Sequence, residues 1–218
     1  MKDIVILGAG GFAREASLLV EELIGSKRRS VKSWNLLGYI DEDEAKWGLT
    51  LRGYPVLGGW EALDKLPGSV SLICVLGDPV AKKKLVENAT ARGREFVTLV
   101  HPEVSFSSDV RLGKGVLINK GCIFTTNITI GNHVSINPGC GIGHDAVIED
   151  YTTLMWHVNI SGAVEVGKGC LLGTKATVLQ GKKIGNWATV GAGAVVTEDL
   201  PPNCTAVGVP AQIIKQHQ

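Results

Sequence analysis

The 218-residue sequence has little that points to a nucleic acid, a membrane or a metal. Its 22 basic and 21 acidic residues nearly cancel, which argues against a broad electrostatic surface for nucleic acid or anionic lipid. No apolar run approaches the length of a membrane span, and the short N-terminal run from Ile4 to Leu7 lacks the layout of a signal peptide. We therefore expect a soluble, cytoplasmic protein with no nucleic-acid partner and no membrane insertion.

The five cysteines contain no CxxC pair, so metal-ligand spacing is absent and we expect no metal. Without an export signal, a disulfide framework is not expected either. Cys122, Cys140 and Cys170 fall in a repeated small-residue position and are interpreted as compact core residues. The basic cluster of Lys27 to Arg29 with Lys32 is interpreted as a solvated loop.

The second half of the chain carries an internal repeat of six residues. Each hexapeptide has two recurring positions. The first is large and apolar, and the second, two residues before it, is mostly small or β-branched, with Lys182 as the exception. Glycine often follows the first position, where the backbone must turn. Seventeen successive residues at the first position are all large and apolar: Val100, Phe106, Leu112, Ile118, Phe124, Ile130, Ile136, Ile142, Ile148, Leu154, Ile160, Val166, Leu172, Val178, Ile184, Val190 and Val196.

A six-residue period fits neither an α-helix nor an alternating strand, but it fits a coil with three flat faces of one hexapeptide each. The large residue of each hexapeptide then points into a triangular prism. Each turn of the prism takes about 18 residues and climbs by one strand spacing, roughly 4.8 Å. The repeat therefore predicts a parallel β-helix over residues 98–218.

The first part of the chain follows a different pattern, in which strands alternate with helices. The apolar periodicity predicts strands over 3–7, 36–40, 70–76 and 96–100, and helices over 14–24 and 80–92. This βαβ order predicts a small doubly wound parallel sheet over residues 1–97. In such a sheet, ligands bind at the carboxyl ends of the strands.

The first strand leads into a glycine-rich turn, where Gly8, Gly10 and Ala13 match the dinucleotide-binding fingerprint. Free amides at the start of the following helix favour a pyrophosphate. Asp41, at the end of the second strand, could hold a ribose hydroxyl or a base edge. The ligand could be a redox dinucleotide or a nucleotide sugar, unless the glycines only shape a tight turn. Because the rest of the chain is repeat rather than a dehydrogenase domain, we favour a nucleotide sugar.

Seven segments together carry a resemblance to one family over nearly the whole chain: Gly8–Arg14, Gly38–Glu42, Leu76–Pro79, His101–Pro102, Gly143–Asp145, Gly191–Thr197 and Gly208–Ala211. With its βαβ domain and hexapeptide repeats, the chain resembles the bacterial sugar-nucleotide N-acetyltransferases of the bacillosamine and perosamine type. The sialic acid O-acetyltransferases are relatives of this family. The resemblance implies a left-handed β-helix, a homotrimer and acetyl-CoA as the co-substrate.

Acetyl transfer from a thioester needs a base on the nucleophile and a donor for the developing oxyanion. His144 is the candidate base because it lies two residues past the inward Ile142 and should point outward. Asp145 could fix the tautomer of His144 or raise its basicity. Gly162 follows His144 by 18 residues, hence one coil further on the same face. The resemblance places the family's catalytic histidine on His144 and its oxyanion-binding amide on Gly162.

The resemblance also implies the remaining contacts of both substrates. The nucleotide sugar would contact Gly10, Gly11, Phe12, Asp41, Glu42 and Gly77. The coil geometry adds Asn137, one strand before His144, as a further polar contact. Acetyl-CoA would lie between neighbouring β-helices, near Thr153, Gly162, Thr174 and Ala192. The chain departs from the family at Phe12 and Thr153, where relatives usually carry histidine.

These observations predict a trimeric enzyme that uses acetyl-CoA to acetylate the amino group of a nucleotide-linked amino sugar. The product would serve surface-polysaccharide or glycan biosynthesis. One alternative is O-acetylation of a sugar of the sialic acid type, which needs the same base. The other is a non-catalytic trimeric scaffold that binds a nucleotide, against which the intact signature Gly143-His144-Asp145 argues.

Overall fold

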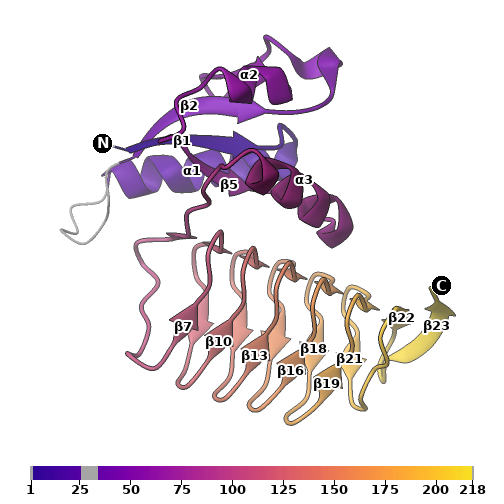
Figure 1. Ribbon diagram of the computed structural model, residues 1–218. Coiled ribbons are helices and arrows are strands. Elements are labelled where there is room, and N and C mark those ends of the chain that lie inside the picture. Colours follow the sequence, from indigo (N-terminus) through magenta and orange to yellow (C-terminus); the bar gives the residue numbers. More distant parts are fainter. Residues whose placement is uncertain (1, 26–33, 218) are drawn as a thin grey trace.

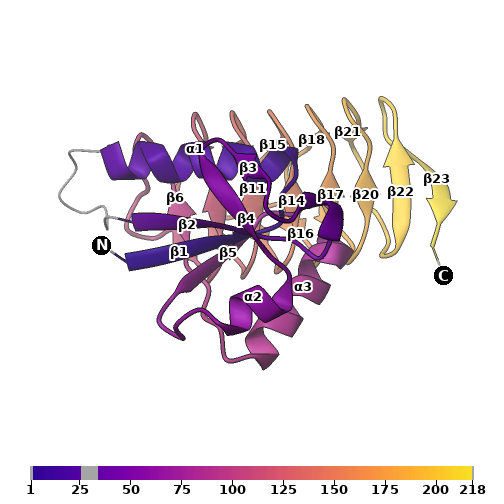
Figure 2. The same cartoon turned by 90° about the horizontal axis from the view of Figure 1, so that it is seen from above.

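An N-terminal α/β domain stands alongside the early coils of a β-helix (Figure 1). The computed structural model describes residues 2–25 and 34–217, so the basic cluster at 27–32 lies outside the described residues. Seen from above, the long axis of the β-helix runs past the N-terminal domain to a C-terminal pair of strands (Figure 2).

The N-terminal domain is built on a five-stranded sheet with the order β3-β4-β2-β1-β5. All neighbouring strands are parallel except β3 and β4, which form an antiparallel pair. The predicted parallel sheet is confirmed for the strands predicted over 3–7, 36–40 and 70–76. The strand predicted over 96–100 is wrong for this sheet: Phe96 makes only an isolated bridge to Leu72, and Leu99–Val100 pair with Leu117–Ile118 of the β-helix. β3 and β4 add an edge that the sequence pattern did not predict. The strands are β1 (Lys2–Leu7), β2 (Trp34–Ile40), β3 (Thr50–Leu51), β4 (Tyr54–Gly58) and β5 (Ser71–Cys74).

Helices cover both faces of this sheet, as a doubly wound fold requires. One face packs on α1 through Leu19 and Val20, and the opposite face packs on α3 through Val86 and Ala89. The helical elements are α1 (Gly11–Gly25), η1 (Glu44–Lys46), α2 (Trp60–Asp64) and α3 (Pro79–Ala91). Asp78 caps α3, because its carboxylate accepts the backbone N–H of Ala81 at 2.7 Å.

The β-helix consists of two-residue strands stacked into three sheets, with a longer antiparallel pair, β22 and β23, at its C-terminal end. One sheet contains β7 (Arg111–Leu112), β10 (Thr129–Ile130), β13 (Val147–Ile148), β16 (Glu165–Val166) and β19 (Lys183–Ile184). A second contains β9 (Ile123–Phe124), β12 (Gly141–Ile142), β15 (Asn159–Ile160), β18 (Thr177–Val178) and β21 (Val195–Val196). The third contains β6 (Leu99–Val100), β8 (Leu117–Ile118), β11 (Ser135–Ile136), β14 (Thr153–Leu154), β17 (Leu171–Leu172), β20 (Thr189–Val190), β22 (Cys204–Val207) and β23 (Gln212–Gln216).

The stacking follows the register that the six-residue period predicts. Within each sheet the two-residue strands pair in parallel with strands 18 residues away, as Gly141 does with Asn159. The large apolar residues of the repeat point inward and form one continuous core, which confirms the predicted left-handed parallel β-helix. All five cysteines are free and buried. Lys182, the exception in the small-residue position, turns its ammonium outward to Glu198 at 3.4 Å.

The two domains meet on the outer face of the sheet that begins with β6. Four successive outward side chains of this sheet lie under the N-terminal domain, and none is more than 1% exposed: Leu99, Leu117, Ser135 and Thr153. The first two join the apolar core beneath α1. The last two face α3 and contact Lys82.

Lys82 is fully buried in this interface and has only uncharged oxygen partners. Its Nζ lies 2.8 Å from Thr153 Oγ1, 3.1 Å from Ser135 Oγ and 3.3 Å from the carbonyl oxygen of Thr152. Burial lowers the pKa of Lys82 to about 7. Near neutral pH the side chain is therefore a hydrogen-bonded amine as much as an ammonium ion, and it connects α3 to the β-helix.

We expect the stability of the protein to rise with pH relative to a Lys82→Met variant. An unfolded lysine has a pKa of about 10.4, so between that value and pH 7 the unfolded state binds more protons than the folded state. From pH 7 to pH 9 the free energy of unfolding should therefore increase by roughly 2 kcal/mol more in the natural protein than in the variant. Urea unfolding at both pH values measures this difference. Equal changes in the two proteins would show that Lys82 titrates like an exposed lysine.

Candidate functional site

A cavity of about 290 Å³ opens at the carboxyl ends of the parallel strands β1, β2 and β5. Its walls combine the apolar side chains of Leu76 and Leu85 with the more polar Glu42, Trp60 and Lys84. Glu42 accepts a hydrogen bond from the indole N–H of Trp60 at 2.6 Å. The cavity lies where open α/β sheets bind their ligands, because the strand ends and the following turns converge there.

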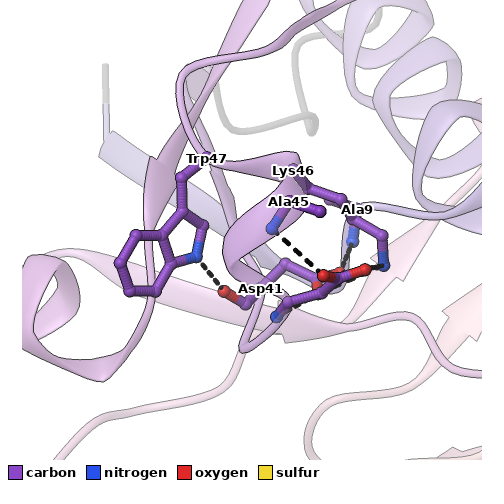
Figure 3. Close-up of polar contacts among 6 residues, drawn as sticks. Ala9, Asp41, Ala45, Lys46 and Trp47 are labelled. Atoms are coloured by element: carbon purple, nitrogen blue, oxygen red, sulfur yellow. Dashed lines mark hydrogen bonds and ion pairs between the residues drawn. The ribbon is translucent and has the colours of Figure 1, made fainter.

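Asp41 connects the turns that follow β1 and β2 (Figure 3). Its Oδ2 accepts the backbone N–H of Ala9 at 2.7 Å, and its Oδ1 accepts the backbone N–H of Asp43 at 3.0 Å. The ammonium of Lys46 lies 3.2 Å from both carboxylate oxygens, and the indole of Trp47 donates to the Asp41 carbonyl at 2.8 Å. Asp41 therefore lines the cavity and at the same time holds the glycine-rich turn against the end of β2.

The predicted residues of the glycine-rich turn lie at the start of α1. Gly10 and Gly11 are exposed, and the first turn of α1 contains no acidic side chain that would repel an anion. Phe12 is half-buried and packs against the core beneath α1. Gly77 is half-buried in the turn between β5 and α3.

His144 stands at an exposed corner of the β-helix, between β12 and β13. Its Nδ1 lies 2.7 Å from Asp145 Oδ2, and the other oxygen of Asp145 accepts the side-chain amide of Asn127 at 2.6 Å. The hydrogen bond from Asn127, followed by that from His144, holds the pKa of Asp145 below its usual value. An ionised Asp145 accepts the Nδ1–H of a neutral imidazole, so we assign the tautomer whose Nε2 is free to accept a proton.

Gly162 packs directly on the imidazole of His144 from the next coil. A Cβ atom at Gly162 would lie 2.5 Å from His144 Cε1 and 2.9 Å from Cδ2, so only glycine fits against this ring. The carbonyl of Gly162 accepts the N–H of Gly181 at 3.0 Å. Its own N–H donates to no acceptor in residues 2–25 or 34–217. The arrangement thus brings a candidate base and an available backbone donor together.

The other predicted residues of the β-helix occupy different surroundings. Thr174 and Ala192 are exposed at another corner, after β17 and β20. Asn137 is only 2% exposed, and its amide donates to the Leu154 carbonyl at 2.9 Å. Thr153 is fully buried against Lys82. The side chains of Asn137 and Thr153 are therefore engaged inside the chain and face other groups of the protein.

In the part of the chain that the structure describes, no group of three or more His, Cys, Asp or Glu side chains could hold a metal ion. No helix in the same residues has the length and apolar character needed to cross a membrane.

Comparisons with known proteins relate both halves of the chain to acetyltransferases. Residues 3–89 match the family described as the PglD N-terminal domain. A crystal structure of a perosamine N-acetyltransferase variant from Caulobacter crescentus, in complex with CoA and GDP-perosamine, has 31% sequence identity and a TM-score of 0.88. The match covers 99% of this chain and 98% of that chain.

The chain belongs to the sugar-nucleotide N-acetyltransferase family.

One further relative is also an acetyltransferase by name, and one further solved structure shares the fold. A Staphylococcus aureus (strain Mu50) protein whose name places it among acetyltransferases is 32% identical over 144 residues, which is 64% of this chain and 71% of that protein. The acetyltransferase domain of PglB from Neisseria gonorrhoeae FA1090, in complex with acetyl coenzyme A, shares the fold. It has 23% identity and a TM-score of 0.86 over 98% of this chain and 99% of that domain.

The sequence pattern missed several residues that the structure places beside the strand-end cavity or beside the pair of His144 and Asp145. Trp60 and Lys84 line the cavity, but no motif marks them because they lie in helices behind the strand ends. Asn127 contacts Asp145, and the sequence does contain a signal for this contact. Asn127 precedes Asp145 by 18 residues, the same spacing that relates His144 to Gly162.

Proposed function

We propose that this acetyltransferase transfers an acetyl group from acetyl-CoA to the amino group of a nucleotide-linked amino sugar. The observation that carries the proposal is the contact of Gly162 with the imidazole of His144 in a chain that also has a strand-end cavity. The relative from Caulobacter crescentus was solved with CoA and GDP-perosamine, which supports both substrate classes.

The nucleotide binds at the carboxyl edge of the N-terminal sheet. The pyrophosphate would take the free amides of Gly10 and Gly11 at the start of α1, where the helix dipole favours negative charge. Lys84 adds a cation to the same cavity, and Trp60 offers an aromatic surface to the base or the sugar. Asp41 acts by holding the turn that presents these amides.

His144 then acts as the general base. Its Nε2 removes a proton from the amine as the amine nitrogen attacks the thioester carbonyl carbon. The tetrahedral oxyanion accepts the N–H of Gly162, which stabilises the charge as it develops. When the C–S bond breaks, the acetyl group stays on the nitrogen and the CoA thiolate takes the proton from the imidazolium. Asp145 stabilises that imidazolium while it exists.

A homotrimer would complete the site. The outward side chains of the sheet that begins with β9 carry no charge: Ile123, Gly141, Asn159, Thr177 and Val195. In contrast, the sheet that begins with β7 exposes Arg111, Glu165 and Lys183. Because the uncharged face runs between the corner of His144 and the corner of Thr174 and Ala192, packing it on a second copy would bring these two corners together. Acetyl-CoA would lie in the groove so formed.

The identity of the acceptor atom is tested by assaying matched substrates. A thermal-shift screen of nucleotide-linked amino sugars with different bases, with and without acetyl-CoA, identifies ligands that stabilise the protein. Each hit is then assayed for CoA release beside its hydroxyl analogue. Turnover of the amine alone is the expected result. Turnover of the hydroxyl compound alone would replace N-acetylation by O-acetylation, and acetyl-CoA that neither binds nor turns over would indicate a nucleotide-binding scaffold.

We expect Asp41→Asn to raise the KM for the nucleotide sugar about tenfold and to leave kcat and the KM for acetyl-CoA nearly unchanged. The variant loses the charge that pairs with Lys46, and it can turn an amide N–H toward the N–H of Ala9, which loosens the phosphate-binding turn. Steady-state kinetics with each substrate varied in turn measures kcat and both KM values.

The matched control is Asp43→Asn. Asp43 also pairs with Lys46, at 3.4 Å, and also accepts a backbone N–H, that of Ala45 at 3.1 Å, but within the described residues its carboxylate has no hydrogen bond to the glycine-rich turn. An equal rise of the KM in both variants would show that Asp41 has no particular role in nucleotide binding.

A further inference from the structure

One corner of the β-helix carries a column of residues with left-handed backbone conformation. Asn127, Asp145 and Ala163 occupy equivalent positions in successive coils, with φ angles of 54°, 60° and 54°. Few residues other than glycine adopt this conformation, and asparagine and aspartate are the ones that tolerate it best. The column therefore stacks the side chain of Asn127 directly against that of Asp145.

Hydrogen bonds hold the segment Thr126-Asn127 on both sides of this stack. The side-chain amide of Asn127 donates to Asp145 Oδ1 at 2.6 Å. In the coil before, the carboxylate of Asp109 accepts the hydroxyl of Thr126. This hydroxyl is the largest cause that lowers the pKa of Asp109 to about 2. The segment is thus anchored from the coil before it through Thr126, while Asn127 holds the carboxylate in the coil after it.

The carboxylate of Asp145 needs such an anchor because of its exposure. The side chains of His144 and Asp145 are each 51% exposed, and an isolated pair at this exposure gains little from its own attraction. An amide on the second oxygen restricts the rotation of the carboxylate, and the carboxylate in turn restricts the imidazole. Asparagine suits this role because it is an uncharged donor, whereas aspartate at the same position would repel Asp145.

We infer that Asn127 is a positioning residue for acetyl transfer, which holds the Asp145 carboxylate so that His144 keeps its Nε2 toward the reacting amine. This inference rests on the proposed role of His144 as the general base. It adds a third member to the pair that the sequence predicts, in the order Asn127, Asp145, His144.

The direct test is Asn127→Gly, because glycine keeps the positive φ without strain and removes only the amide. We expect kcat to fall about tenfold, as the loss of one hydrogen bond to a charged group allows. Both KM values should stay within about twofold, since no substrate contact is lost. The matched control is Asn203→Gly, at a φ of 56° and with no side-chain hydrogen bond in the described part of the chain. The two variants should have similar melting temperatures.

A double-mutant cycle with Asp145→Gly separates positioning from a structural effect. If Asn127 acts through Asp145, adding Asn127→Gly to Asp145→Gly should lower kcat less than twofold further. A tenfold loss in both backgrounds, or full activity of Asn127→Gly alone, would overturn the inference. The outcome is distinct from failure of the proposed function: a fully active His144→Ala variant refutes the base itself, whereas an active Asn127→Gly beside an inactive His144→Ala refutes only the positioning role.

Discussion

The His144→Ala variant should turn over its substrates roughly 10²–10⁴-fold more slowly than the natural protein, because it lacks the group that removes the amine proton. Since His144 is exposed, its side chain contributes little to the core, and the melting temperature should change little. The KM values should also change little if the imidazole contributes mainly to the transition state. Steady-state kinetics with thermal unfolding on the same preparation measures both effects.

Two further variants make this result specific. His144→Asn keeps an N–H that can reach Asp145 but has no basic nitrogen, so it should be as slow as the alanine variant. His217→Ala removes an exposed histidine at the far end of the chain, whose Nε2 lies 2.8 Å from Thr205 Oγ1, and should keep full activity. If His144→Asn were active while His144→Ala was not, the histidine would serve a structural contact rather than proton transfer.

Gly162→Ala should lower kcat by roughly 10²–10³-fold, an effect comparable to the loss of one oxyanion donor. The added Cβ would overlap the imidazole of His144, so the ring or the backbone of the coil must move. Either movement separates the base from the donor, and displacements of about 1 Å at a reacting centre cost this much. Single-turnover kinetics at saturating acetyl-CoA isolates the chemical step.

The matched control for this variant is Gly68→Ala. Gly68 has neither a positive φ nor an atom within contact distance of an added Cβ, so the same methyl group should be neutral there. Full activity of Gly162→Ala would mean that Gly162 and His144 do not form one site, even though they touch. A large loss of melting temperature in Gly162→Ala alone would point instead to strain in the β-helix.

The six-residue period predicted the β-helix because one physical requirement, an apolar side chain pointing into the prism, recurs without interruption from Val100 to Val196. The same period determines which residues stack in successive coils. The 18-residue separation of His144 and Gly162 therefore predicts their contact. The same count reaches Asn127 from Asp145. Its contact with Asp145 was not predicted because no motif marks a residue that binds the carboxylate from the coil before.

Contacts between the two domains could not be predicted from the six-residue period. The six-residue period placed Thr153 and Asn137 in the β-helix, but nothing in their spacing shows that Lys82, about 70 residues earlier in the chain, packs on Thr153. The sheet edge formed by β3 and β4 was missed for a different reason, since β3 has only two residues and no apolar alternation. The carboxyl-edge cavity was predicted from strand order, and its helical wall at Trp60 and Lys84 was not.

We expect the acetyl group to be delivered to a nitrogen of a nucleotide-linked sugar. The most direct measurement is to incubate the natural protein with isotope-labelled acetyl-CoA and a nucleotide-linked amino sugar, and to identify the product by mass spectrometry and NMR. We predict a gain of one acetyl group whose labelled carbonyl is an amide coupled to the sugar nitrogen, and we expect His144→Ala to form this product at least about 100-fold more slowly. A labelled ester on a sugar oxygen, or release of CoA without acetylated sugar, would contradict the claim.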